Sequence, residues 1–187
     1  MAYVRVKRIK KNGKEYSYAY LVENRWKKRV GAGSKKGARQ KVKGYLGKVH
    51  SFPKALNKEL ISHFAISDVK SYVSEKGVNE IVKDLARLEL VNHGFAENGD
   101  FYSNADLAVY MGNDFFIKRL SDESDRKIVI AMNEGYFCKE TFEKLLNFKA
   151  SGNEKEVGLA LANAILGAGL SVPKEVFVEM FNKVIER

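Results

Sequence analysis

The chain has a single cysteine, a single glutamine and only two prolines among its 187 residues. One cysteine excludes both an internal disulfide and a zinc site built on cysteines. No apolar run reaches the about 18 residues that a membrane-spanning helix needs, and the sequence shows no signal peptide, so it predicts a cytoplasmic protein with no membrane partner. The scarcity of glutamine and cysteine beside abundant lysine and glutamate leans slightly toward a thermophilic source.

Acidic residues are almost missing from the first fifty positions, which hold 16 lysines and arginines but only Glu15 and Glu23. The other 137 residues hold 17 bases and 21 acids, so the excess positive charge lies in the first quarter of the chain. A merely solvated surface mixes both signs of charge, whereas an unopposed positive segment suits a polyanion. The charge distribution therefore predicts a nucleic-acid-binding β-module at residues 1–50.

The pattern of these residues indicates antiparallel strands. Side chains alternate over residues 2–10 and 15–23, and Asn12-Gly13 lies between them. This dipeptide is the strongest short hairpin signal, because a type I′ turn needs positive φ at both central positions. A third strand is expected at 40–46, ending at Gly47, so the module is a two- or three-stranded sheet with a long basic loop.

Residues 55–187 show helical periodicity instead, and Phe52-Pro53 marks the expected boundary. The predicted class is α+β: a basic N-terminal antiparallel sheet followed by a mixed helical domain with a small β-meander at about 101–132. The meander strands are expected near 105–111, 115–120 and 127–132. Small residues between 158 and 168 suit either a tight helix pair within the chain or the seam of a homodimer. The predicted helices cover about 57–63, 67–75, 78–91, 139–148, 154–168 and 173–186.

Cations at alternate positions along a strand project about 6.6–6.8 Å apart, which is comparable to the spacing of successive phosphates. A two-stranded ribbon also fits the major groove of B-DNA. The candidate nucleic-acid-binding residues are Arg5, Lys7, Arg8, Lys10, Lys11, Lys14, Arg25, Trp26, Lys27, Lys28, Arg29, Lys35, Lys36, Arg39, Lys41 and Lys43.

Three tyrosines share one face of the second strand: Tyr16, Tyr18 and Tyr20. They could stack on unpaired bases. Alternatively they form the apolar face by which a small sheet packs on the rest of the protein, and we favour packing because such a sheet needs a hydrophobic face to be stable.

The first fifty residues resemble the N-terminal segment of insertion-sequence transposases of the DDE class. The shared features are a basic strand, a Gly turn, an aromatic strand ending in Leu-Val-Glu and a basic stretch ending in Tyr-Leu-Gly. The resemblance implies a shared nucleic-acid-binding module, without the catalytic domain, for which residues 55–187 leave no room. Those residues resemble only uncharacterised prokaryotic proteins, in particular archaeal ones. The matching positions are Tyr3, Arg5, Lys10, Gly13, Tyr16, Tyr18, Tyr20, Leu21, Val22, Glu23, Arg39, Gln40, Lys41, Val42, Tyr45, Leu46 and Gly47.

The sequence thus predicts a non-catalytic nucleic-acid-binding protein without cofactor or metal, and the resemblance puts DNA slightly ahead. The first alternative is an RNA- or ribosome-associated factor that inserts its basic hairpin into structured RNA. The second is a Mg²⁺-dependent nuclease, for which two or three carboxylates would have to gather around the ion. A protein partner or a second copy could bind through residues 55–187. The acids considered for a metal are Asp100, Asp106, Asp114, Asp122, Glu123 and Asp125.

Overall fold

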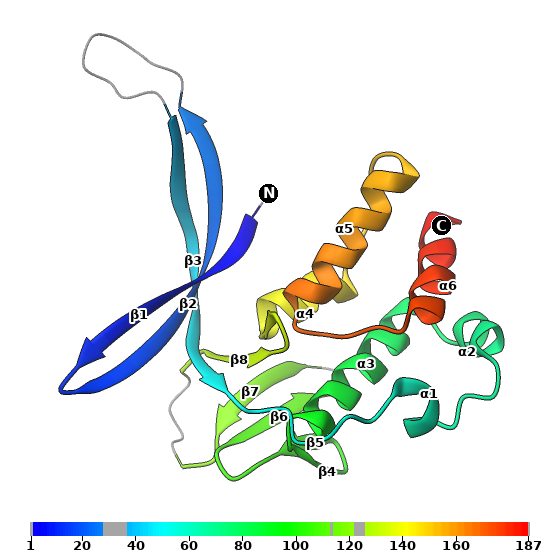
Figure 1. Ribbon diagram of the computed structural model, residues 1–187, viewed down its shortest axis with the longest axis horizontal. Helices are drawn as coiled ribbons and strands as arrows, with labels where there is room; N and C mark the ends of the chain where they lie inside the picture. Colours follow the sequence, from blue (N-terminus) through cyan, green and yellow to red (C-terminus); the bar gives the residue numbers. More distant parts are fainter. Residues whose placement is uncertain (1, 28–36, 113, 122–125, 187) are drawn as a thin grey trace.

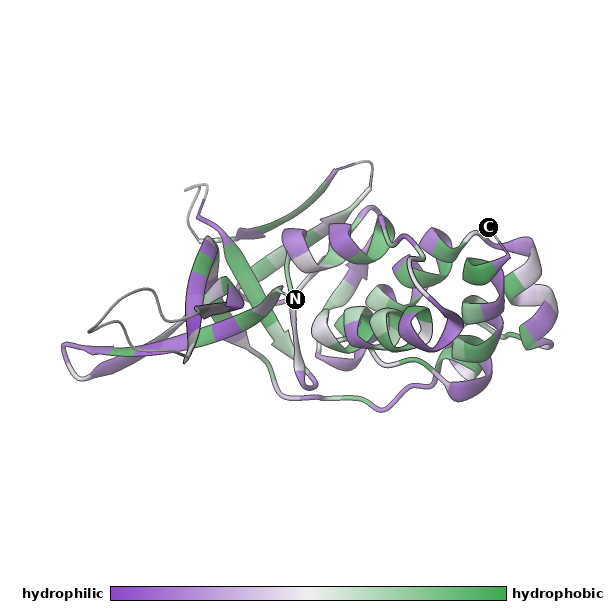
Figure 2. Cartoon of the chain, turned by 90° about the horizontal axis from the view of Figure 1, so that it is seen from above, coloured by the Kyte–Doolittle hydropathy of each residue, from purple (hydrophilic) through white to green (hydrophobic). Residues whose placement is uncertain are grey.

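The computed structural model describes residues 2–27, 37–112, 114–121 and 126–186. Within these residues it contains six helices and two β-sheets, and the first three strands precede all the helices (Figure 1). The predicted α+β class is therefore confirmed. Seen from above, the first strands extend to one side with many hydrophilic residues, and the helices gather at the other (Figure 2). Among the described residues, no helix is long and apolar enough to cross a membrane.

The N-terminal strands are β1 (Ala2–Lys11), β2 (Lys14–Lys27) and β3 (Gly37–Ser51). Asn12 and Gly13 connect β1 to β2 with φ values of 52° and 74°, the positive pair that a type I′ turn requires. The predicted hairpin is thus confirmed. β2 also pairs antiparallel with β3. The β1–β2 end and the β2–β3 end point away from the helices in different directions, which gives the sheet two arms (Figure 1).

The third strand does not end at Gly47, as expected, but continues to Ser51 and joins the rest of the chain. Residues 48–51 pair in parallel with β8 (Ile128–Met132), and β8 pairs with β9 (Gly135–Phe137). Gly47 makes this junction possible, because a Cβ there would lie 2.4 Å from the Lys127 carbonyl oxygen. One five-stranded sheet, in the order β1-β2-β3-β8-β9, therefore spans both predicted parts.

The second sheet contains two of the three strands that the sequence predicts for the meander. It is antiparallel, in the order β4-β5-β6-β7. The segment expected as the last meander strand is β8, which lies in the other sheet. Its residues 128–130 are all buried, as is typical of an interior strand covered on both faces. The strands are β4 (Ala96–Asn98), β5 (Phe101–Ser103), β6 (Leu107–Met111) and β7 (Phe115–Arg119).

All six predicted helices are present, with ends that differ by up to three residues. Asn153 caps α5 by accepting a hydrogen bond from the Glu156 amide, and Glu156 accepts one from the Asn153 amide, which forms a capping box. A Cβ on Gly158 would lie 3.4 Å from the Phe181 ring, so at this position the small side chain lets α5 and α6 pack within the chain. The helices are α1 (Leu60–His63), α2 (Val69–Glu75), α3 (Val78–Asn92), α4 (Lys139–Leu146), α5 (Glu154–Gly167) and α6 (Lys174–Ile185).

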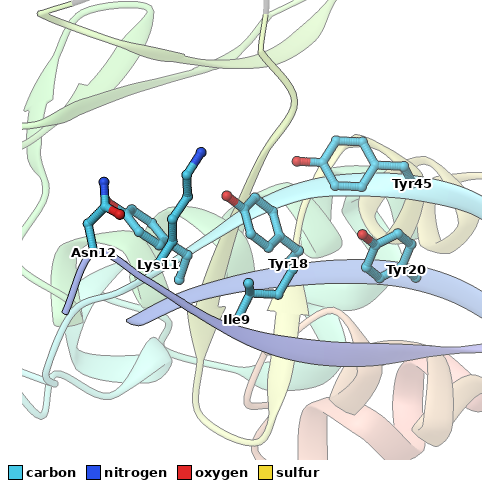
Figure 3. A pocket seen from close by; sticks show the side chains of 7 residues that line it. Ile9, Lys11, Asn12, Tyr18, Tyr20 and Tyr45 are labelled. Atoms are coloured by element: carbon cyan, nitrogen blue, oxygen red, sulfur yellow. The ribbon is translucent and has the colours of Figure 1, made fainter. Parts of the chain in front are cut away.

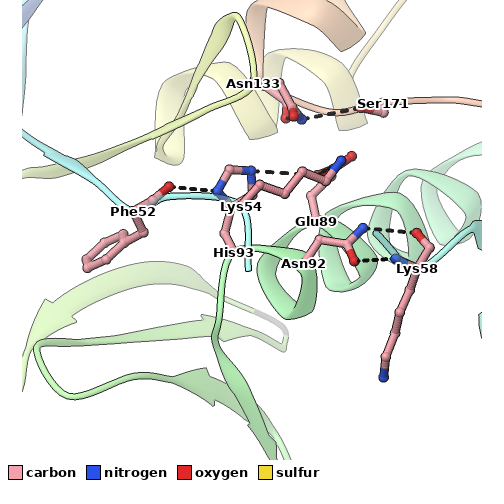
Figure 4. Close-up of polar contacts among 9 residues, drawn as sticks. Phe52, Lys54, Lys58, Glu89, Asn92, His93, Asn133 and Ser171 are labelled. Carbon is pink, nitrogen blue, oxygen red and sulfur yellow. Dashed lines mark hydrogen bonds and ion pairs between the residues drawn. The ribbon is translucent and has the colours of Figure 1, made fainter. Parts of the chain in front are cut away.

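The segment between β3 and α1 lies against the C-terminal end of α3 (Figure 4). Asn92 accepts a hydrogen bond from the Lys58 amide at 2.8 Å and donates one to the Lys58 carbonyl at 3.0 Å. His93 Nδ1 donates to the Phe52 carbonyl at 2.9 Å, and its Nε2 lies 3.9 Å from the buried carboxylate of Glu89. These contacts attach the connection at both of its ends.

Two groups of buried side chains hold the molecule together. The larger surrounds α3 and includes residues of the second sheet and of all the other helices. The smaller is formed by Ala19, Leu46, Val129 and Cys138, with Val4, Val6 and Leu21 among the residues packed against it. The members of this smaller cluster come from β1, β2 and β3 on one side and from β8 and the start of α4 on the other. It therefore fixes β1–β3, which we call the basic sheet, to the rest of the chain, which we call the body.

Candidate nucleic-acid interface

The pairing of β1 with β2 separates their side chains into two faces. Arg5 is paired with Tyr20, Lys7 with Tyr18 and Ile9 with Tyr16, and paired residues project to the same side of a sheet. Tyr45 of β3 joins them through ring contacts, and Lys48 lies over the Tyr16 ring. We call this surface the tyrosine face: Tyr3, Arg5, Lys7, Ile9, Lys11, Tyr16, Tyr18, Tyr20, Tyr45 and Lys48.

The other face of the same strands packs on the body. Ala19 is completely buried, and Val4, Val6 and Leu21 pack beside it in the smaller cluster. The expectation that the tyrosines attach the sheet to the rest of the protein is therefore wrong. Alternation predicts that two faces exist, but the small Ala19 and Gly47 decide which face the body can approach closely.

The tyrosines surround an open hollow of about 660 Å³ (Figure 3). The centroid of the Tyr45 ring lies 5.5 Å from that of Tyr20 and 6.4 Å from that of Tyr18, with planes tilted by 57° and 45°. Tilted rings do not cover one another's faces, so part of each π-surface stays available to a ligand. Tyr45 is 43% exposed, and Tyr16, Tyr18 and Tyr20 are half-buried.

Lys11 lines this hollow, other cations of β1 lie on the same face, and the acids of β2 lie on the opposite face. Arg5, Lys7 and Lys11 are exposed on the tyrosine face. By the same alternation, Glu15 and Glu23 point to the other side, together with Arg8 and Lys10. Glu15 lies 3.8 Å from Arg8, so part of the positive charge on that side is neutralised. The electrostatic contrast thus exists between the two faces as well as along the sequence.

The β2–β3 arm carries a second group of predicted residues. Glu23 accepts a hydrogen bond from Arg25 at 2.9 Å and lies 3.8 Å from Lys43. The Arg25 guanidinium and then Lys43 hold the pKa of that carboxyl below its usual range. Trp26 is 64% exposed, and Arg39 and Lys41 are exposed as well. Lys14 lies at the hairpin turn and Lys27 at the end of β2, whereas Lys28, Arg29, Lys35 and Lys36 lie outside the described residues.

The predicted site residues omit Tyr45 and Lys48. Alternation in the third strand places Tyr45 on one of its two faces. It does not predict that Tyr45 lies beside Tyr18 and Tyr20, because no short turn fixes the register between β2 and β3. Lys48 was missed because Gly47 was interpreted as the end of the strand. Burial lowers the pKa of Lys48, and the neighbouring charges of Arg119 and Arg126 lower it further. Cations from the second half of the chain therefore adjoin the tyrosine face.

The carboxylates considered for a nuclease are dispersed where the structure describes them. Asp100, Asp106 and Asp114 are exposed at turns, where Asp is favoured for backbone reasons. Asp122, Glu123 and Asp125 lie outside the described residues. Within the described ranges, no group of three or more His, Cys, Asp or Glu side chains could hold a metal ion. Cys138 is buried at the start of α4, and burial raises the pKa of its thiol.

No family model, curated protein or solved structure matches the chain.

Proposed function

We propose that the protein binds nucleic acid through β1, β2 and β3, and does so without cleaving it. The observation that carries this proposal is the tyrosine face, on which Arg5, Lys7 and Lys11 border half-buried aromatic rings while Glu15 and Glu23 point to the other side. Arg5 and Lys7 stand two positions apart on one strand, so their spacing of about 6.6–6.8 Å matches successive phosphates. A cytoplasmic location and a nucleic acid as partner belong to the same proposal.

DNA comes slightly ahead of RNA because the strand, turn and strand pattern resembles the transposase segment. Structured RNA is the second candidate, and the shape of the molecule favours it. Two basic arms extend from a body whose residues 51–187 carry slightly more acids than bases (Figure 1). Such arms can contact the phosphates of folded RNA across its wide, shallow minor groove.

The test measures the affinity of the chain for duplex DNA, single strands and structured RNA over a range of salt concentrations. Each phosphate contact with a duplex contributes about 0.9 to the slope of log affinity against log salt. Replacing Arg5, Lys7 and Lys11 by Ala should therefore lower that slope by up to about 2.7 and weaken binding. These positions are exposed, so stability should change little.

A control variant makes the same change in net charge on the helical side of the chain, with Lys149, Lys155 and Lys174 replaced by Ala, all of them exposed. Its affinity should stay close to that of the wild type. A salt response that is flat for every nucleic acid, or equal losses in both variants, would reject the proposal. Incubation of labelled substrates with Mg²⁺ tests for cleavage, and its appearance would favour the nuclease alternative.

A further inference from the structure

We propose that the tyrosine face accommodates the unpaired nucleotides of a single strand, with bases on the rings of Tyr18, Tyr20 and Tyr45 and phosphates on the surrounding cations. This inference rests on the proposed function and deepens it, because it names the form of nucleic acid that the surface selects. Single-stranded DNA and an unpaired stretch of RNA both combine free base faces with phosphates, and they differ in the sugar.

The arrangement of the rings supports contact with bases. Aromatic side chains bind single strands because every base has a π-face, which is free only when the base is unstacked. In a duplex those faces are covered by neighbouring base pairs, and only base edges and the backbone are accessible. A hollow with four tyrosine rings in its lining therefore offers little to a duplex and much to a single strand (Figure 3).

A second aromatic group in the same molecule shows the contrast. Tyr110 of β6 is stacked between Phe101 and Phe116, with centroid distances of 5.1 Å and 4.3 Å and planes within 24° and 14°. The faces of these three rings therefore cover one another across the strands of the second sheet. The rings of the tyrosine face are tilted instead, so their faces are not used in the same way.

The charges around the rings support a nucleotide as the ligand. Lys11 lines the hollow, and the ammonium of Lys48 lies 5.1 Å from the centroid of the Tyr16 ring. Arg5 and Lys7 stand beside Tyr20 and Tyr18 on the neighbouring strand. Rings alternating with cations match a ligand in which bases alternate with phosphates.

The hydroxyl of Tyr45 remains neutral in this environment. Burial raises the pKa of Tyr45, and the nearby Tyr18 and Tyr20 raise it further. A neutral phenol can donate a hydrogen bond to a phosphate or base oxygen, whereas a phenolate would repel the backbone. The Tyr45 hydroxyl therefore adds no negative charge to the hollow.

The experiment compares binding of the full chain to oligothymidylate and oligouridylate of about 12 nucleotides and to a blunt duplex of equal length. Both single strands should bind more tightly than the duplex, and the tighter of the two identifies the natural source as DNA or RNA. Replacing Tyr18, Tyr20 and Tyr45 by Leu should weaken single-strand binding by at least about fivefold for each ring in contact. Duplex binding should change little.

Two further variants separate stacking from folding. The triple Phe variant at the same positions keeps the rings and should retain single-strand affinity. The matched aromatic control, Tyr110→Leu with Phe116→Leu, removes two rings from the second sheet and should leave binding unchanged. Photocrosslinking of a 5-iodouracil oligonucleotide to the wild-type chain should modify Tyr18, Tyr20 or Tyr45, and this readout does not depend on any variant folding.

Equal affinity for duplex and single strands, together with full binding by the triple Leu variant, would overturn this inference. Crosslinks found only on the second sheet would do the same. Either result would leave the proposed function standing if the salt dependence and the Arg5, Lys7 and Lys11 variant behave as expected. Absence of salt-dependent binding to any nucleic acid would instead reject the proposed function itself.

Discussion

At the scale of single residues, Gly47 decides how the basic sheet meets the body. Its φ of 144° and the Lys127 carbonyl oxygen, 2.4 Å from where a Cβ would lie, both require glycine. At Gly44, in the same strand, a Cβ would meet nothing within 4 Å, and the backbone has no such φ. The structure therefore requires glycine at position 47 but not at position 44, although nothing in the sequence distinguishes the two positions.

We predict that Gly47→Ala lowers the free energy of unfolding by about 3 kcal/mol, since the methyl group forces β3 away from β8 and strains the backbone. Gly44→Ala is the matched control and should change stability far less. Denaturant unfolding followed by circular dichroism measures both. Equal effects of the two substitutions would mean that the contact with Lys127 does not determine the junction.

His50 lies at the parallel pairing of β3 with β8 and links stability to pH. Burial lowers its pKa below the ordinary 6.5; Lys48 and Arg119 lower it further, and Asp106 opposes them. As the pH falls, the unfolded chain therefore binds a proton at His50 at a higher pH than the folded chain does. The contribution of His50 to stability is fully present above about pH 6.5 and is lost as the pH falls below that value.

We expect the free energy of unfolding to decrease as the pH falls through the range just below 6.5, and the decrease to be smaller in His50→Gln. Urea unfolding at several pH values measures it. His63→Gln removes an imidazole from α1 instead and serves as the matched control. An unchanged pH profile in His50→Gln would contradict the assignment.

At the scale of elements, α3 positions the connection that leaves the basic sheet. Asn92, at its last position, is buried and hydrogen-bonds to both the amide and the carbonyl of Lys58. The main-chain carbonyl of Asn92 also accepts hydrogen bonds from Ala55 and Leu56 at 2.8 Å and 3.0 Å. One residue thus fixes residues 55–58 on the end of the helix.

We predict that Asn92→Ala lowers the free energy of unfolding by about 1–2 kcal/mol, because both side-chain hydrogen bonds are lost in a buried place. Asn147 follows α4, and among the described residues its side chain hydrogen-bonds within its own helix end, to the Glu143 carbonyl. Asn147→Ala should therefore cost less, as thermal unfolding of the two variants will show. A larger loss at Asn147 would contradict this role for Asn92.

Local pattern was enough to predict the helices, the Asn12-Gly13 hairpin and the division of β2 into two faces, because each depends on neighbours within a few residues. It was not enough for the partner of β8. Residues 127–132 follow the meander directly, and sequence proximity favours local pairing, yet their burial on both faces is satisfied only beside β3. The same limit applies to the tyrosines, since alternation defines a face and only the tertiary contact decides which face the body covers.

At the scale of the whole molecule, the basic sheet and the body are connected by one continuous β-sheet as well as by packed side chains. The predicted boundary at Phe52-Pro53 falls just after β3 ends. The five-stranded sheet nevertheless continues from β3 into β8 and β9. Ala19 and Leu46 from the first part pack against Val129 and Cys138 from the second. The sheet that carries the tyrosine face is therefore joined to the body by packed side chains as well as by strand pairing.

We predict that residues 53–187 alone are less stable than the full chain. Removing residues 1–52 takes away β3, one of the two strands that pair with β8, and exposes Val129 and Cys138. Burial of a side chain of this size is worth about 1.5–3 kcal/mol. The free energy of unfolding should therefore fall by about 3 kcal/mol or more, measured by denaturant titration with amide exchange at β8 and β9.

Adding residues 1–52 as a separate peptide should restore the lost protection, because the parallel pairing between residues 48–51 and 128–131 needs no covalent link. A fragment as stable as the full chain, with unchanged exchange in β8, would mean that the sheet on which the tyrosine face lies is an appendage of an independent body.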